Sequence, residues 1–502
     1  MPLPLNLSPP QIQFPSNNTA TCVFALCPRS TVMARFLFAF IAALSATCAA
    51  QPPTNVIIIL ADDLGYGGLA CYGHPRFKTP NIDRMAAEGM RLTHFNVPTA
   101  SCAPTRASLL TGRYPFRCGL TANPSPSGPP EHNDLALPRS EVVLPQLFKQ
   151  AGYASGMVGK WHMGHKLPEY LPTSRGFDEY LGILYSNDMR PVQLLDGDKV
   201  IEYPVVQGTL TRRYTARALD FLQRNAAKPF FFYFAHAMPH KPLATTERFY
   251  QKSGAGLYGD IMADLDASVG EVLAKVKELG LDERTLIIFA SDNGPWYGGS
   301  SGGLRAMKGG SWEGGYRVPF IARWPGKIPA GGVSSALGMM PDVFATSLAA
   351  AGIAVPTDRV IDGRSLLPVL TTGASSPHDV IFGHQGPRLA TIRDARWKLH
   401  VLPATERRDG TPGERWIDPW GPDGVTLLAP FEQYQPSDYP GVRTGDPGKA
   451  GALFDLLADP AEQRDVSAQN PEVVARLQKK FDLVNADVPK LAAGKMQAVQ
   501  KK

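Results

Sequence analysis

The chain has 502 residues, of which 44% are hydrophobic and 19% are charged, and its formal net charge is +6. A chain of this length and composition can bury a large core, which excludes an intrinsically disordered protein. The first 50 residues hold two arginines, Arg29 and Arg35, and no acidic residue, so the remainder carries +4. That charge is too small to indicate a nucleic-acid-binding protein.

The amino-terminal region, residues 1–50, is typical of an export leader. Residues 1–32 are rich in Pro, Asn and Ser and show no pattern of a folded element. Met33, an alternative translation start, is followed by one arginine, a short apolar run and small residues up to Ala50. This order predicts a signal peptide cut after Ala50, and the run is too short for a stable membrane span. We therefore expect a periplasmic or secreted protein, with a lipid anchor at Cys48 as the alternative.

Beyond the leader, predicted strands and helices alternate. The strands are expected over 55–61, 153–158, 229–235 and 286–290, and the helices over 141–150 and 261–279. Several of these strands are continuous apolar runs, which is typical of strands that are covered on both faces of a parallel sheet. The sequence therefore predicts an α/β fold with a sheet sandwiched by helices. Polar clusters follow the strands, at the edge where ligands bind in such sheets.

The composition changes after about residue 375. Strand-like pieces, as in 390–402, alternate with Pro-, Gly- and Asp-rich loops over 403–450, and a last helix is predicted over 471–484. These features favour a smaller α+β domain after the main one. The predicted organisation is a leader at 1–50, a main domain at 51–375, a smaller domain at 376–490 and a basic tail at 491–502.

Two pairs of oxygen-bearing side chains follow predicted strands. Asp62 and Asp63 come directly after the first strand, and Asp292 and Asn293 follow the last one. No cysteine–histidine cluster with zinc spacing accompanies them. A set of oxygen ligands with three carboxylates favours Ca²⁺ or Mg²⁺ over a transition metal. The structural alternative is that each pair only forms a turn at a strand end.

The segment 101–113, Ser-Cys-Ala-Pro-Thr-Arg-Ala-Ser-Leu-Leu-Thr-Gly-Arg, begins a predicted helix. Pro104 suits the first helical turn, because its missing N–H costs no hydrogen bond there. Cys102 would then lie at the helix N-terminus, where free backbone N–H groups favour an anion. A thiol nucleophile needs a base, and no histidine is close to Cys102 in the sequence. A buried cysteine that opens a core helix is the structural alternative.

This segment resembles the signature of the type I sulfatases, Cys-x-Pro-x-Arg followed by Leu-Thr-Gly, with Thr105 at the place of the usual serine. In that family a formylglycine-generating enzyme oxidises the cysteine to formylglycine, which is hydrated to a geminal diol. The resemblance extends from residue 55 to about 466. Over 176–188 it is closest to the group of arylsulfatase A and N-acetylgalactosamine-6-sulfatase. It implies an alkaline-phosphatase-like mixed sheet sandwiched by helices, with a smaller C-terminal α+β domain.

The resemblance also implies the metal site. Its ligands would be Asp62, Asp63, Asp292, Asn293 and the residue made from Cys102. The family usually binds Ca²⁺, and Mg²⁺ is possible. Formylglycine and this metal are therefore the expected cofactors.

Four further blocks, 159–162, 238–242, 304–310 and 312–319, match sulfatase blocks and carry basic residues. A sulfate ester needs cations, because negative charge shifts onto the bridging oxygen as the S–O bond breaks. The expected catalytic residues are Cys102, Arg106, Lys160, His162, His240 and Lys308.

The resemblance gives these residues separate roles. Arg106 and Lys160 would hold the diol and the oxygens on the metal side, and His162 would contact the second hydroxyl of the diol. His240 and Lys308 would bind the sulfate, with one of them assisting the leaving group. The expected substrate-binding residues are Lys160, His240, Lys308 and, by the match over 176–188, Ser186. Glu313 and Arg317 are expected to hold their loop rather than take part in the chemistry.

We therefore predict a sulfuric ester hydrolase of the arylsulfatase type that acts on a sulfated carbohydrate or an aryl sulfate. Two alternatives remain, a phosphonate or phosphate ester hydrolase of the same superfamily and a non-catalytic binder of sulfated glycans with Cys102 unmodified. Loops at 121–135, 184–205 and 403–450 are expected to shape the substrate pocket. The last of them carries three aromatic residues that could stack on sugar rings, Trp416, Trp420 and Tyr434. Cys71 and Cys118 either form a disulfide or stay free thiols.

Overall fold

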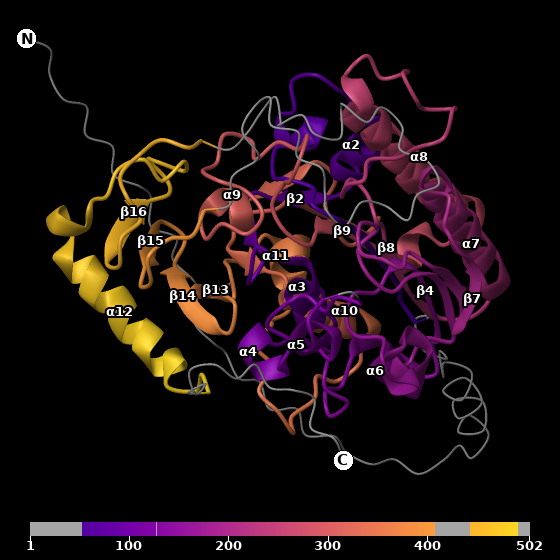
Figure 1. Cartoon of the computed structure of the whole chain (residues 1–502), viewed down its shortest axis with the longest axis horizontal. Helices are drawn as coiled ribbons and strands as arrows, with labels where there is room; N and C mark the ends of the chain where they lie inside the picture. Colours follow the sequence, from indigo (N-terminus) through magenta and orange to yellow (C-terminus); the bar gives the residue numbers. More distant parts are fainter. Residues whose placement is uncertain (1–52, 127, 407–441, 490–502) are drawn as a thin grey trace, which may run out of the picture. The chain divides into compact units, whose positions relative to one another are not determined.

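The computed structural model describes residues 53–126, 128–406 and 442–489, and a ten-stranded sheet lies at its centre (Figure 1). The strands of this sheet are β1 (Asn55–Ala61), β2 (Met90–Leu92), β4 (Ala154–Lys160), β5 (Glu179–Ile183), β6 (Leu194–Asp196), β7 (Lys199–Glu202), β8 (Phe230–Ala235), β9 (Thr285–Ser291), β10 (Phe320–Arg323) and β11 (Gly332–Ser334). Their order across the sheet is β11-β2-β10-β9-β1-β8-β4-β5-β6-β7. The strands from β9 to β5 are parallel to their neighbours, whereas β10, β6 and β7 pair in antiparallel fashion.

The side chains of β1 alternate between two apolar clusters, one on each face of the sheet. Ile58 and Leu60 belong to one cluster, and Ile57 and Ile59 belong to the other. Successive side chains on a strand point to opposite faces, so a strand that is covered on both faces must be apolar at every position. This explains the continuous apolar run over 55–61 from which the strand was predicted.

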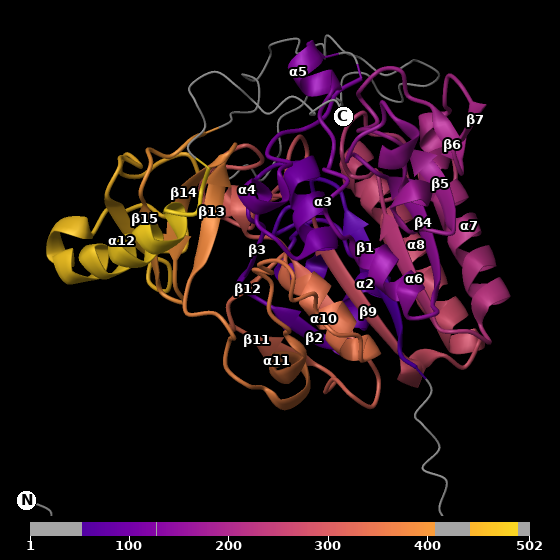
Figure 2. The ribbon, with the colours of Figure 1, turned by 90° about the horizontal axis from the view of Figure 1, so that it is seen from below.

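Helices cover both faces of the sheet. The longer ones are α2 (Pro80–Ala87), α3 (Cys102–Thr111), α6 (Leu144–Gln150), α7 (Leu210–Asn225), α8 (Gly256–Glu278) and α10 (Asp342–Ala351), and the short ones are α4 (Pro115–Cys118), α5 (Pro130–Asn133), α9 (Glu313–Tyr316) and α11 (Leu367–Thr372). Helices α2, α7 and α8 pack in the cluster with Ile57, and Figure 2 shows α7 and α8 side by side. Helices α3, α6 and α10 pack in the cluster with Ile58. The predicted α/β class is confirmed.

A second, antiparallel sheet lies in the C-terminal part of the chain. It contains, in this order across the sheet, β13 (Ile381–Gln385), β14 (Arg388–Arg393), β15 (Trp397–His400) and β16 (Ala452–Asp455). Helix α12 (Pro471–Asn485) covers it, with Leu477 and Phe481 packed against Ile392 and Leu399. A two-stranded sheet is formed by β3 (Phe95–Asn96) and β12 (Gly338–Met339). These elements belong to the same compact unit as the central sheet, and the division at 375/376 stays a prediction.

Some elements differ in extent from the predicted ones. The helix predicted over 141–150 begins only at Leu144, because Val143 is extended (φ −110°, ψ 153°) and Pro145 occupies the first turn. The strand predicted over 153–158 continues to Lys160. Among the described residues, Cys71 and Cys118 are free thiols, so the structure contains no disulfide between them.

Several predictions concern residues outside the described ranges. These are the leader at 1–50, the tail at 491–502 and the aromatic residues Trp416, Trp420 and Tyr434 of the long loop. Within the described ranges, no helix combines the length and the apolar character needed to cross a bilayer.

Candidate active site

The two predicted pairs of metal ligands meet at one edge of the central sheet. β1 and β9 are parallel neighbours with Ala61 opposite Ser291, so the residues that follow the two strands lie side by side. The backbone N–H of Asp63 donates to Asp292 Oδ1 (3.1 Å), and the Asn293 amide donates to Asp63 Oδ1 (2.7 Å). Strand pairing thus brings residues from distant parts of the chain into one hydrogen-bonded group.

Cys102 is the first residue of α3, and its side chain points at these carboxylates. Its Sγ lies 3.7 Å from Asp62 Oδ1 and 3.9 Å from Asp63 Oδ1, and the residue is completely buried. Burial raises the pKa of the Cys102 thiol well above its usual value, although Lys160 and Lys308 act in the opposite direction. A thiolate is therefore disfavoured at neutral pH, which argues against the unmodified cysteine as the nucleophile.

Four buried side chains, that of Cys102 among them, offer a group of metal-binding atoms. One oxygen, sulfur or ring nitrogen from each of Asp62, Asp63, Cys102 and His240 lies within 4.8 Å of the others. Asn293 Oδ1 is also buried and has no hydrogen-bond partner among the described residues. A divalent cation would take up this oxygen and offset the repulsion between the carboxylates. Asp62, Asp63, Cys102 and Asn293 belong to the ligand set expected from the sequence, and their donor atoms suit a divalent cation. His240, expected at the sulfate, joins the group instead of Asp292, whose Oδ2 is bound by Arg106.

Arg106 and Lys160 bind two of the carboxylates. Arg106, in the second turn of α3, places Nε 2.9 Å and Nη2 2.8 Å from Asp292 Oδ2, and its Nη1 donates to the carbonyl oxygen of Lys160 (2.9 Å). Lys160, the last residue of β4, places Nζ 2.5 Å from Asp62 Oδ2. All four side chains are completely buried. Buried charges of this kind persist only where they compensate one another.

The charges separate the protonation of Asp62 from that of Asp292. Burial raises the pKa of Asp62 to about 7, and Asp292 raises it too, against the influence of Lys160 and Arg106. The pKa of Asp292 is lowered, because Arg106, Lys160 and Lys308 together outweigh the effect of its burial. Asp62 therefore bears most of the repulsion between the carboxylates, which a bound cation would relieve.

Lys308 and His240 both reach Asp63. Lys308 Nζ lies 2.8 Å and His240 Nε2 lies 3.5 Å from Asp63 Oδ2. The ring of Trp296 contacts both residues, with its centroid 4.5 Å from Lys308 Nζ and 5.2 Å from the His240 ring. Trp296 was not singled out from the sequence. A signal that could have identified Trp296 is its position directly after the polar turn 291–295.

Hydrogen bonds fix the tautomers of the two predicted catalytic histidines. His240 Nδ1 lies 2.5 Å from the carbonyl oxygen of Lys241, and His162 Nε2 lies 3.1 Å from that of Pro124. A ring nitrogen that faces a carbonyl carries the proton, so His162 Nδ1 and His240 Nε2 keep their lone pairs in the neutral rings. Burial lowers the pKa of both histidines well below the usual value, and Lys160 lowers both further. Both rings are therefore neutral at pH 7.

Ser186 lies on the loop after β5, and this loop is tied to the one that carries His240. Asn187 donates to the carbonyl oxygens of His240 (3.4 Å) and Pro242 (3.2 Å), and Gln207 donates to the carbonyl oxygen of Asn187 (2.6 Å). The Oγ of Ser186 is buried and has no hydrogen-bond partner within the described part of the chain. This hydroxyl is thus available to a ligand.

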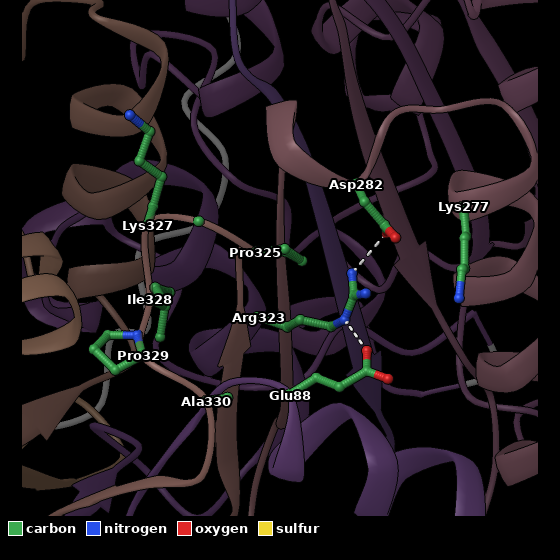
Figure 3. Close-up of a pocket in the computed structure, with 10 residues that line it drawn as sticks. Glu88, Lys277, Asp282, Arg323, Pro325, Lys327, Ile328, Pro329 and Ala330 are labelled. Atoms are coloured by element: carbon green, nitrogen blue, oxygen red, sulfur yellow. Dashed lines mark hydrogen bonds and ion pairs between the residues drawn. The ribbon is translucent and has the colours of Figure 1, made fainter.

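A cleft of about 630 Å³ lies elsewhere on the molecule (Figure 3). Arg323 at its centre lies 2.7 Å from Glu88 and 2.9 Å from Asp282, so its charge is already compensated. Arg323 pairs with Ile287 near the start of β9, whereas the acidic cluster follows the end of that strand. We therefore place the functional site at the cluster around Cys102 and not in this cleft.

Comparisons with known proteins point to one family. The sulfatase family model matches residues 54–353. The chain is 37% identical to N-acetylgalactosamine-6-sulfatase of Canis lupus familiaris over 91% of this chain and 90% of that protein, and 35% identical to arylsulfatase A of Homo sapiens over 89% and 90%. The crystal structure of the PsFucS1 sulfatase from Pseudoalteromonas sp. superposes with a TM-score of 0.71 at 25% identity, over 93% of this chain and 96% of that one. The matched range includes every residue of the cluster described above.

Proposed function

Because the chain belongs to the sulfatase family and is a sulfuric ester hydrolase, we propose that it cleaves sulfate monoesters with a formylglycine made from Cys102 and a bound divalent cation. The observation that carries this proposal is the position of Cys102. Cys102 is the first residue of α3. Its side chain faces the carboxylates of Asp62 and Asp63 and is surrounded by buried cations. As a thiol it is a poor nucleophile, because its pKa is raised.

Formylglycine fits the surroundings of Cys102. The hydrated aldehyde supplies two hydroxyls on one carbon, of which one is the nucleophile towards sulfur. An oxygen at the position of Sγ would lie near the donor atoms of Asp62 and Asp63, so it can join the coordination of a cation. The neutral His162 ring, held by its Nε2 hydrogen bond to Pro124, is suited to accept the proton of the second hydroxyl at Nδ1.

We propose Ca²⁺ as the metal, bound by Asp62, Asp63, Asp292 and Asn293 with the residue made from Cys102. The donor oxygens are hard ligands, and Ca²⁺ accepts the higher and less regular coordination that such a set offers, whereas Mg²⁺ demands an octahedron. When bound, the cation polarises the nucleophilic hydroxyl and the sulfate oxygens. The free Oδ1 of Asn293 supports this assignment.

The remaining cations orient the substrate. Lys308, beside Asp63, supplies N–H donors to the sulfate oxygens, and Lys160 and Arg106 hold the oxygens on the metal side. His240 Nε2 faces the same space, but the neutral ring carries its proton on Nδ1, so we assign to the ammonium group of Lys308 the transfer of a proton to the leaving oxygen. We assign Ser186 as a further hydrogen-bond donor to the substrate, because its Oγ has no partner within the described residues and the adjacent Asn187 is bound to the His240 backbone.

The first experiment tests Cys102 directly. We expect the chain co-expressed with a formylglycine-generating enzyme to hydrolyse an aryl sulfate, and Cys102→Ala to abolish the activity. The peptide that contains Cys102 should be about 18 Da lighter than the unmodified peptide, because CHO replaces CH₂SH. Cys118→Ala, which changes another buried cysteine, is the matched control and should keep the activity. Unchanged activity of Cys102→Ala would refute the proposal, and unmodified thiol without turnover would favour a non-catalytic glycan binder.

The family assignment favours sulfate esters over the phosphonate and phosphate esters that we considered from the sequence. A comparison of kcat/KM for matched aryl sulfate and aryl phosphonate esters measures this preference. A preference for the phosphonate by more than about tenfold, which corresponds to about 1.4 kcal/mol, would overturn it.

We propose a sulfated carbohydrate as the natural substrate, since the chain is 37% identical to an N-acetylgalactosamine-6-sulfatase. The loops 121–135 and 184–205 would contact the sugar, together with the loop 403–450. Removal of 407–441 should raise KM for a sulfated saccharide and leave a small aryl sulfate largely unaffected. Equal losses on both substrates would contradict a role of this loop in sugar binding.

We further propose that the protein is exported and that its signal peptide is cut after Ala50. The mass and the amino-terminal sequence of the protein from the native source would test the cut. A mature chain that still contains the residues 36–44 would contradict it.

A further inference from the structure

A second group of buried charges lies outside the site around Cys102. It joins α9 to the C-terminal sheet, and we call it the anchor cluster. Its members are Glu313, Arg317, Arg393, Lys398, His400 and Glu462. Exposure of these side chains to solvent is at most 5%, so each charge depends on the others for compensation.

Glu313, the first residue of α9, is the centre of the anchor cluster. Its carboxylate lies 2.6 Å from Arg393 Nη1, 2.8 Å from Arg317 Nη2 and 3.3 Å from Lys398 Nζ. Burial alone would raise the pKa of Glu313, but these three cations lower it well below its usual value. Two of the cations come from β14 and β15, so the C-terminal sheet supplies most of the charge that keeps Glu313 ionised.

Glu462 connects the anchor cluster to the backbone. Its Oε2 accepts the N–H of Glu313 (2.6 Å), and its Oε1 lies 3.0 Å from Lys398 Nζ and 3.1 Å from His400 Nε2. Its own carbonyl oxygen accepts Arg305 Nη1 (2.9 Å). The backbone of Glu462 adopts a left-handed conformation (φ 54°), which is unfavourable for a residue with a side chain and persists only where the surroundings impose it.

The contacts of Glu462 close the neck of the loop that carries Lys308. We call residues 305–314 the lysine loop, because the N–H of Gly314 donates to the carbonyl oxygen of Arg305 (2.8 Å) and so closes it. Glu462 binds both sides of this neck, through Arg305 on one side and Glu313 on the other. Lys308 lies between these ends, with Nζ 2.8 Å from Asp63.

We propose that Glu462 is a positioning residue for Lys308, so that the C-terminal sheet sets the affinity of the site for the sulfate group. Among the described residues, Glu462 makes no hydrogen bond or ion pair with the carboxylates around Cys102. It holds the Glu313 end of the lysine loop with its side chain and the Arg305 end with its backbone carbonyl. A displacement of about 1 Å at a binding group can lower the rate by about 100-fold. This inference rests on the proposed role of Lys308 in sulfate binding.

The test is a double-mutant cycle in the full-length, formylglycine-containing enzyme. The variants are Glu462→Ala, Lys308→Met and the double variant, with Asp455→Asn as the matched control. Asp455 lies on the same sheet, pairs with the exposed Arg396 and, among the described residues, makes no hydrogen bond or ion pair with the lysine loop. Asn keeps an oxygen for the backbone N–H groups that Asp455 accepts. The measured quantities are kcat/KM for an aryl sulfate and the inhibition constant of inorganic sulfate, each at equal formylglycine content.

Glu462→Ala removes the carboxylate that holds the Glu313 end of the lysine loop and keeps the backbone carbonyl that accepts Arg305. We expect this loss at one end to lower kcat/KM and to raise the inhibition constant of sulfate about 10- to 100-fold. In the Lys308→Met background the same substitution should change kcat/KM less than about threefold, because the two residues act in sequence. Asp455→Asn should behave like the native enzyme. Glu462→Gln keeps an oxygen for the Glu313 N–H and should therefore retain more activity than Glu462→Ala. If Glu462→Ala does not fold, Glu462→Gln takes its place in the cycle.

Two results would overturn the inference. If Glu462→Ala reduces kcat/KM by the same factor with and without Lys308, Glu462 stabilises the fold but does not act through the lysine. If Lys308→Met itself has no effect, the proposed sulfate site fails, and the inference fails with it. A normal loss for Lys308→Met together with native kinetics for Glu462→Ala would leave the proposed function intact and reject only the role of Glu462.

Discussion

Lys160 Nζ lies 2.5 Å from Asp62 Oδ2, and both side chains are completely buried. Lys160 is the last residue of β4 and Asp62 directly follows β1, and these strands are not neighbours, because β8 lies between them. The lysine therefore reaches across the end of one strand to neutralise a carboxylate of the proposed metal site. A cation bound at the proposed metal site would compensate the charge of the Asp62 carboxylate, which Lys160 also compensates.

Lys160→Met should destabilise the metal-free enzyme more than the Ca²⁺-loaded enzyme. Removal of one partner of a buried ion pair typically costs about 3–5 kcal/mol, because the remaining charge is uncompensated. A bound cation would compensate Asp62 in place of the lysine. We expect Tm to fall strongly in EDTA and much less in CaCl₂, as followed by calorimetry. Lys166→Met, at an exposed lysine, is the control, and an equal loss under both conditions would contradict the prediction.

Chelation should lower the stability of the native enzyme, and Ca²⁺ should restore it. A ligand that is present at 1,000 times its Kd stabilises the folded state by about 4 kcal/mol. Asn293→Ala should weaken Ca²⁺ binding at least about tenfold in titration calorimetry, because it removes the buried Oδ1 that has no protein partner within the described residues. Asn133→Ala, on the short helix α5, should leave binding unchanged. Full Ca²⁺ affinity in Asn293→Ala would remove this residue from the metal site.

Asp264 on α8 should make the enzyme less stable as the pH rises. Its burial raises the pKa to about 6 from an ordinary value near 3.8, so the folded state holds the proton more tightly than the unfolded state does. The contribution of Asp264 to the free energy of unfolding is therefore most favourable below pH 3.8, and this contribution is lost as the pH rises through 6. Between pH 5 and pH 8 the expected loss is about 1–1.5 kcal/mol.

Asp264→Asn should abolish this part of the pH dependence. The comparison of denaturant unfolding at pH 5 and pH 8, for the native enzyme and the variant, isolates the contribution of Asp264 from that of all other groups. Asn can keep an oxygen for the hydroxyl of Thr245, which donates to Asp264 Oδ2 (2.9 Å). Identical pH profiles of the two proteins would show that Asp264 does not titrate in this range.

Cys71 and Cys118 should both remain reduced and unreactive in the folded enzyme. Burial raises the pKa of each thiol to about 12, so very little thiolate is present at pH 8. Iodoacetamide should alkylate both residues in urea and neither of them in the native protein, as measured by peptide mass spectrometry. A peptide pair linked through Cys71 and Cys118 would contradict the free thiols of the structure.

The central strands could be predicted almost to the residue, as could the starts of α3 and α12, whereas the starts of α6 and α8 could not. β1, β8 and β9 are covered on both faces, so their apolar runs mark their ends in the sequence. Helix α8 begins at Gly256, five residues before the apolar pattern that predicted it. Asp260, the fifth residue of this helix, accepts the backbone N–H groups of residues 251–253, and such a tertiary use of a polar side chain leaves no periodic signal.

The sequence placed the two carboxylate pairs at strand ends, which strand pairing then brings together, but it did not show which cation meets which carboxylate. Which cation meets which carboxylate depends on the order of the strands, which no local pattern contains. Trp296 and Glu462 were missed for the same reason, because their partners lie in other segments. Trp296 contacts His240 and Lys308, and Glu462 contacts the two ends of the lysine loop. The resemblance to the sulfatases reached about residue 466 and so included Glu462, but it did not indicate that this side chain binds the backbone N–H of Glu313.

The neighbours of β1 in the central sheet have a consequence for the biosynthesis of the enzyme. Val56 pairs with Phe231 on one side and with Leu286 on the other, so the centre of the sheet is completed only after more than half of the chain has been synthesised. Until then α3 has no finished sheet to pack on, and the thiol of Cys102 would be open to the proposed modifying enzyme. Pairings between segments so far apart in the sequence also form slowly. The topology would thus prolong the interval in which the proposed modification can take place, and folding would end that interval by burying the residue.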